Sequence, residues 1–271
     1  MTKSSIVRTA LACLVPVATA WPQTSTSKTA DILREARAYQ FQFRAGQYDV
    51  VLQYVATLEE AAKTDPENAD LSNAMGVAYL AQAAGTMLTG GKPVEAFTAV
   101  QKGMHSLEHA LELNPDHAEA LATHGGVQAM MASFQQQPQL AAKGVADMNR
   151  AVELAPNSVR VRLVRAFNGL SLPDALRSNA AEAEDLDFLI RVAGGSRAGD
   201  YLHIMRGDLY FELGKLDLAR NQYEMAGKSA SPATIEATAR LTALTEGGVP
   251  VTDIKKLRSA AGANCVMCHG R

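Results

Sequence analysis

Apolar and polar residues along most of the chain form Ala-rich segments with the spacing of helices, and three of these segments close in the same way. Ala110-Leu-Glu-Leu-Asn-Pro115 recurs as Ala151-Val-Glu-Leu-Ala-Pro156, and a weaker copy reads Ala61-Ala-Lys-Thr-Asp-Pro66. Proline has no amide proton and cannot continue a helix, so each copy predicts a helix end. The closing prolines lie 49 and 41 residues apart, a period that favours a solenoid of helical pairs.

Further helices are expected between and after these copies. Helical runs are expected over Val159–Leu170 and Asn179–Val192, and a last helix over Thr234–Thr245 is expected to cover the final apolar face of the array. The Gly85–Pro93 stretch is interpreted as an insertion between the two helices of one pair, and Gln135–Gln139 as a lengthened turn. The sequence thus predicts four to five helical pairs over residues 31–246.

The residues around the closing prolines resemble the tetratricopeptide repeat. Its small and aromatic positions are clearest in GDLYFELGKLDLARNQYEMA, which holds Gly207, Tyr210, Gly214, Ala219, Tyr223 and Ala226, and weaker matches include Gly76, Tyr79, Ala118 and Gly125. The resemblance implies an all-α, right-handed solenoid with a groove for a protein or peptide. Asp31–Pro66 lacks the expected glycine and Val159–Gly199 has few repeat residues, so an irregular helical bundle stays open as an alternative.

Composition and charge narrow the function classes. Hydrophobic residues make up 47% of the 271 residues, charged residues 20%, and the formal net charge is −2. A chain with this balance is not expected to bind nucleic acid or an anionic membrane surface. No apolar run after the first 20 residues approaches the roughly 18 residues of a membrane span, so none is expected.

The first 20 residues differ from the rest and read as a signal peptide. Lys3 and Arg8 precede an apolar run, and Ala18-Thr19-Ala20 has the small-x-small form that signal peptidase cleaves. We therefore expect cleavage after Ala20, a loose leader over 21–30 and a periplasmic protein. Two alternatives remain: a short N-terminal helix of a cytoplasmic protein, or a lipoprotein anchored at Cys13.

The chain ends in a motif that carries chemistry. After a break at Gly247-Gly248-Val249-Pro250 and a short expected helix over Asp253–Ala261, residues 265–271 read Cys-Val-Met-Cys-His-Gly-Arg. Cys-x-x-Cys-His is the attachment signature of c-type haem, which assigns Cys265 and Cys268 as thioether anchors of one covalent haem c and His269 as the proximal iron ligand. A thiol–disulfide pair and a zinc site are the alternatives.

The motif leaves the sixth iron ligand unassigned, because only Gly270 and Arg271 follow it. Its terminal placement is similar to that of the four-helix cytochromes c-prime. The upstream candidates are His203 and Met205 in the last clear repeat, and a partner protein is the alternative source. His105 and His109 have the i, i+4 spacing of a metal pair or of two surface histidines, His124 is expected between helices, and Met130-Met131 reads as core.

Two functions follow from this sequence. The first is an exported monohaem cytochrome that passes electrons to or from a protein docked on the repeats, with self-association through the haem tail as an option. The second is a protein–protein interaction scaffold of the cell envelope, in which the haem is structural or senses a small gas or peroxide. Neither function is an enzyme, and we find no glycine-rich phosphate loop or nucleophile elbow in the sequence.

Overall fold

The computed structural model describes residues 29–35, 50–193, 197–228 and 233–246, and every element in these ranges is a helix. Residues 29–35 are helical, and the remaining elements are α2 (Val50–Thr64), α3 (Ala69–Leu88), α4 (Pro93–Leu113), α5 (Ala118–Phe134), α6 (Pro138–Leu154), α7 (Val159–Ser171), the 3-10 turn η1 (Asp174–Leu176), α8 (Asn179–Ala193), α9 (Arg197–Glu212), α10 (Leu216–Ala226) and α11 (Ala233–Thr245). None of the described helices is long and apolar enough to cross a membrane.

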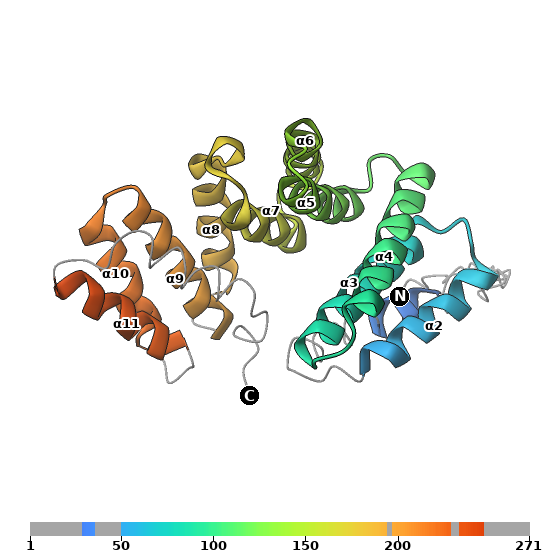
Figure 1. The fold of residues 1–271 in the computed structure, drawn as a ribbon, viewed down its shortest axis with the longest axis horizontal. Coiled ribbons are helices and arrows are strands. Elements are labelled where there is room, and N and C mark those ends of the chain that lie inside the picture. Colours follow the sequence, from blue (N-terminus) through green and yellow to red (C-terminus); the bar gives the residue numbers. More distant parts are fainter. Residues whose placement is uncertain (1–28, 36–49, 194–196, 229–232, 247–271) are drawn as a thin grey trace, which may run out of the picture.

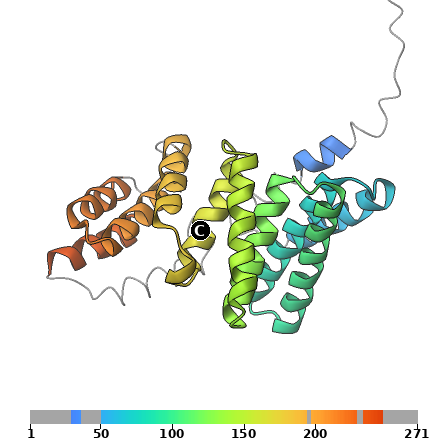
Figure 2. The same ribbon diagram turned by 90° about the horizontal axis from the view of Figure 1, so that it is seen from above.

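Successive helices pack as antiparallel pairs that follow one another along an arc (Figure 1). The pairs are α3 with α4, α5 with α6, α7 with α8 and α9 with α10, while α2 packs on α3 and α11 closes the array against α10 and α9. The same order along the long axis is visible from above (Figure 2). The predicted all-α array of helical pairs is thus confirmed, and the expected last helix over 234–245 is α11.

Three connections, those before α3, α5 and α7, share one design. Pro66, Pro115 and Pro156 each lie two residues before a residue whose side chain caps the next helix. The side chains of Asn68, His117 and Ser158 accept the backbone N–H of the residue three positions on, which satisfies an amide that the helix itself cannot pair. The prolines therefore mark pair boundaries as predicted, whereas the caps that start each pair were not foreseen.

The turns inside three pairs each place one residue in the left-handed region. That residue is Gly90 (φ 76°) between α3 and α4, Gln136 (φ 57°) between α5 and α6, and Gly214 (φ 69°) between α9 and α10. The expected insertion over Gly85–Pro93 is smaller than the sequence indicated, because residues 85–88 continue α3 and only 89–92 form the turn. The extra residues therefore lengthen α3 and α4 rather than forming a loop.

Small residues let the two helices of a pair approach closely, as the repeat pattern predicted. A Cβ added to Gly76 of α3 would lie 2.6 Å from Leu107 Cγ of α4, and one added to Gly125 of α5 would lie 2.6 Å from the Gly144 carbonyl oxygen of α6. Gly207 of α9 faces the ring of Tyr223 on α10 without room for a side chain. Glycine fits these three crossings because the Leu107 side chain, the Gly144 backbone and the Tyr223 ring occupy the space that a Cβ would need.

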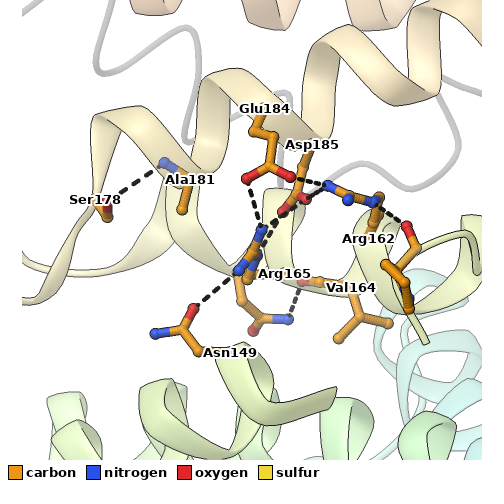
Figure 3. Close-up of polar contacts among 10 residues, drawn as sticks. Asn149, Arg162, Val164, Arg165, Ser178, Ala181, Glu184 and Asp185 are labelled. Atoms are coloured by element: carbon orange, nitrogen blue, oxygen red, sulfur yellow. Dashed lines mark hydrogen bonds and ion pairs between the residues drawn. The ribbon is translucent and has the colours of Figure 1, made fainter. Parts of the chain in front are cut away.

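The pair α7–α8, which has few repeat residues, is held by a buried ion cluster (Figure 3). Asp185 of α8 is fully buried and accepts hydrogen bonds from Arg165 Nε at 2.6 Å and from Arg162 Nη1 at 2.8 Å, both on α7. Arg165 Nη1 also donates to Asn149 Oδ1 of α6 at 3.1 Å. Multiple charge-assisted bonds compensate the burial of the carboxylate and link three consecutive helices.

The end of the array contains a second buried ion pair. Asp208 of α9 accepts hydrogen bonds from Arg240 Nε of α11 at 2.7 Å and from the Tyr223 hydroxyl of α10 at 2.8 Å. Arg240 is only 1% exposed, and its pKa is raised overall: burial lowers it, and the charges of Asp208 and Glu236 raise it by more. The last helix is thus attached to α9 by a specific ionic contact as well as by apolar packing.

Candidate interaction cleft

An open cleft of about 330 Å³ lies where the pair α3–α4 meets the pair α5–α6. Its lining comes from one face of α4, the C-terminal half of α5 and the start of α6. The apolar part of the lining consists of Phe97, Val100, Met104, Met131, Ala132 and Leu140. Phe97 is 53% exposed and Leu140 is 37% exposed, so large apolar side chains are available at the mouth of the cleft.

Two stripes of apolar residues run along α4, one buried in the array and one lining the cleft. The buried stripe (Ala96, Ala99, Gly103, Leu107 and Ala110) packs within the array. A second apolar stripe with helical spacing contains Phe97, Val100 and Met104 and is followed one turn later by Glu108, and all four residues line the cleft. This second stripe is the signal in the sequence that could have revealed the site, and it was missed.

Two polar side chains on α5 have buried atoms without hydrogen-bond partners among the described residues. They are Gln128, whose Oε1 is unpaired, and His124, whose two ring nitrogens are both unpaired. The residues are one turn apart and therefore share a helix face. Gln128 lines the cleft directly. Because most buried polar groups in proteins are hydrogen-bonded, an unpaired one beside an open cleft suits the binding of a ligand with polar groups.

His124 is packed between helices, as the sequence predicted, and its surroundings change the pKa of its imidazole. Its side chain is 8% exposed, and Nε2 lies 3.7 Å from Glu108 Oε1, too far for a hydrogen bond. Burial lowers the pKa of His124 below its ordinary 6.5, while the negative charge of Glu108 acts in the opposite direction. The imidazole is therefore mainly neutral near pH 7, and it does not neutralise the Glu108 carboxylate.

The other histidines that the sequence singled out do not converge on one site. His105 lines the cleft, whereas His109 Nε2 lies 3.2 Å from the Pro66 carbonyl oxygen and its Nδ1 lies 3.4 Å from Glu112. Within the described ranges no three His, Cys, Asp or Glu side chains are grouped so that they could hold a metal ion. Met130 is 41% exposed, which corrects its interpretation as core, because it lies on the outer side of α5.

The residues expected to attach the haem lie outside the described ranges, whereas the two candidates for the sixth iron ligand lie within them. Cys265, Cys268 and His269, the short helix expected over Asp253–Ala261 and the signal peptide over 1–20 all fall outside these ranges. The two candidates for the sixth ligand are described. His203 Nδ1 lies 2.8 Å from Gln222 Oε1 of α10, and Met205 is 9% exposed in the core between α7, α8 and α9.

No protein-family model and no curated protein matches the chain. Among solved structures, the chain is similar to a tetratricopeptide repeat protein from Parabacteroides merdae ATCC 43184. The two share 16% sequence identity with a TM-score of 0.37, and the match covers 87% of this chain and 92% of that chain. The description of this chain as an array of helical pairs rests on its own internal contacts and not on that likeness.

Proposed function

We propose that the helical pairs form an interaction scaffold that holds a segment of a partner protein in the cleft between α4, α5 and α6. The observation that carries the proposal is the combination of exposed apolar side chains with the buried, unpaired Oε1 of Gln128 in one open cleft. Exposed apolar surface beside a concave site is typical of protein interaction surfaces. A chain segment supplies both the apolar side chains and the polar groups that such a cleft needs.

The energetics favour a partner segment over an empty cleft. Burying a large apolar side chain such as Phe97 contributes about 1.5–3 kcal/mol when it is removed fully from water. Pairing Gln128 Oε1 with a donor adds about 1 kcal/mol and removes an unsatisfied buried acceptor. A few such contacts, made on preformed helices, are sufficient for a specific complex because little ordering of the scaffold is required.

In this proposal the scaffold acts in the cell envelope and carries haem. Export rests on the signal-like residues 1–20, and haem attachment rests on Cys265, Cys268 and His269. Two thiols followed directly by an imidazole are a donor set that suits a covalently attached haem. When bound, the haem supplies an iron that takes up electrons or binds a small molecule, which gives the scaffold a redox or sensory element.

A second candidate function is electron transfer by an exported monohaem cytochrome, and the observation that favours it is the same terminal motif. In that function the cleft would position a redox partner, and Cys265, Cys268 and His269 would hold a haem that supplies one-electron chemistry. The two functions share the docking site and differ in the use of the haem. Reversible reduction of the haem iron that changes neither its ligands nor the affinity for the partner would favour electron transfer. Binding of carbon monoxide to the iron would favour a sensor.

Site-specific photo-crosslinking in the native host tests the docking site. The photoreactive amino acid p-benzoylphenylalanine replaces Phe97 at the cleft or Ile235 on α11, which is 76% exposed and serves as the matched control. We expect a discrete crosslinked protein from position 97 that position 235 does not give, and its loss when Leu140 is changed to Glu. Equal products from both positions, or none from position 97, would contradict the proposed function.

A further inference from the structure

We infer that the partner segment carries a basic side chain flanked by bulky apolar residues, and that Glu108 and Gln128 recognise it. This inference rests on the proposed function and adds the chemistry of the segment. It starts from the charge of the cleft. Glu108 is the one acidic residue among the lining residues, and the lining contains no lysine or arginine.

Glu108 has no cationic partner within the described residues. Its nearest potential partner is His124, 3.7 Å away, and burial keeps that imidazole mainly neutral. Lys143 of α6 already forms an ion pair with another carboxylate, because its Nζ lies 2.7 Å from Asp147 Oδ2. An unpaired carboxylate at the rim of an apolar cleft attracts a basic group over an acidic or neutral one.

The cleft lining includes the amides of Gln101 and Gln135 and the imidazole of His105, and two further acceptors are available to a ligand. The Glu108 carboxylate accepts only, and the buried Gln128 Oε1 is an unpaired acceptor. Lysine and arginine are pure donors, with three and five N–H groups, so either side chain offers donors to both residues. A carboxylate or carbonyl ligand would instead face two acceptors and leave them unpaired.

The walls of the cleft match the rest of a basic side chain and its neighbours. Lysine and arginine place an aliphatic stem on apolar surface while the charged end stays near water. Phe97, Met104 and Met131 provide that surface, and Glu108 is 54% exposed at the edge where the charged end would lie. The thioethers of two methionines adapt to different apolar neighbours, which suits recognition of a segment rather than of one fixed small molecule.

A displayed random-peptide library, selected on the full chain, tests this inference. We expect enrichment of arginine or lysine next to leucine, isoleucine, phenylalanine or methionine. The most enriched peptide is then measured against the wild-type chain, Glu108→Gln, and Glu224→Gln on α10. The last is a matched control, because it removes the same charge from an exposed residue outside the cleft lining. Circular dichroism confirms that each variant is folded.

Loss of the carboxylate is expected to weaken binding about fivefold, the upper range for a partly exposed ion pair. Changing the basic residue of the peptide to glutamine should have a similar effect on the wild-type chain and little further effect on Glu108→Gln, because the two groups form one pair. Glu224→Gln should bind as the wild type does. Enrichment of acidic or uncharged peptides, or equal effects of the two glutamate variants, would overturn the inference.

The variant Phe97→Glu separates this inference from the proposed function. Peptides that lose binding in Phe97→Glu but not in Glu108→Gln leave the docking site in place and contradict only the basic side chain. Peptides that bind both variants as tightly as the wild-type chain would contradict the docking site itself. A library in which no peptide is enriched would also contradict it.

Discussion

Gly125 of α5 and Gly144 of α6 cross so closely that neither has room for a side chain. A Cβ on Gly125 would lie 2.6 Å from the Gly144 carbonyl oxygen and 3.0 Å from Asp147 Cβ. His124, which precedes Gly125, is buried beside this crossing. The contact therefore places His124 in the closely packed part of the pair α5–α6.

Gly125→Ala is expected to destabilise the protein by about 1–3 kcal/mol, because backbone rather than a flexible side chain occupies the space that the methyl group needs. Chemical denaturation measures this change. Gly169→Ala on α7 is the matched control, since no atom lies within 4 Å of its Cβ position. It should raise the free energy of unfolding by about 0.5–1 kcal/mol through helix propensity. Equal effects of the two substitutions would contradict the close crossing.

Asp208→Asn is expected to destabilise the end of the array by about 1.5–3 kcal/mol, because it removes the ion pair with Asp208 and leaves Glu236 as the carboxylate partner of the buried Arg240 guanidinium. Hydrogen exchange in α11 should increase more than exchange in α3. The exposed Asp217→Asn on α10 is the control and should change stability by less than about 1 kcal/mol. Unchanged exchange in α11 would show that apolar packing alone holds this helix.

The lowered pKa of His124 predicts that the stability of the protein depends on pH. Because burial places its folded pKa below 6.5, the unfolded chain binds this proton more readily than the folded protein. The stability that neutral His124 contributes is therefore full above pH 6.5 and is lost as pH falls through 6.5 toward the folded pKa. Glu108 and Asp147 reduce the shift, and Lys143 adds to it.

Denaturant titrations at several pH values measure this effect. His124→Gln should lose less stability than the wild type as pH falls below 6.5, whereas the exposed His105→Gln should behave as the wild type does. A wild-type slope that persists in His124→Gln would assign the pH dependence to other groups.

Covalent haem is a prediction of the terminal motif. The full chain, expressed with the haem-attachment machinery in an exporting host, should keep a haem stain after denaturing electrophoresis, and Cys268→Ala should lose or weaken it. The control is Cys13→Ser, which should keep the stain because Cys13 lies in the expected signal peptide. A colourless wild-type chain would remove haem from both candidate functions.

The fold was predictable where local chemistry determines it. The prolines at 66, 115 and 156 end helices whatever their surroundings, and glycines such as Gly76 and Gly207 fit the close crossings that the repeat pattern requires. The pair α7–α8 was predicted as two helices, but nothing in the sequence marks Asp185 as a buried residue. It is buried because α7 brings two arginines to it, a contact that depends on the tertiary structure.

The second stripe on α4 is visible in the sequence, but whether it lines an open cleft was not predictable for the same reason. Phe97 and Met104 form a second stripe on α4, and only the stacking of two pairs decides whether such a stripe is covered or open. Gln128 and His124 are unremarkable in the sequence, since their lack of partners appears only when the neighbouring helices are in place. The haem motif shows the opposite case, because its chemistry is local and its residues lie outside the described ranges.

The docking site is tested most directly by hydrogen–deuterium exchange with a synthetic peptide that spans the segment crosslinked at position 97. Binding of this peptide should slow exchange in α4 and in the C-terminal half of α5, and leave α9 and α10 unchanged. The same peptide should give no protection in Phe97→Glu. Protection located on α9 and α10, or protection that survives Phe97→Glu, would contradict the cleft between α4, α5 and α6 as the site of partner binding.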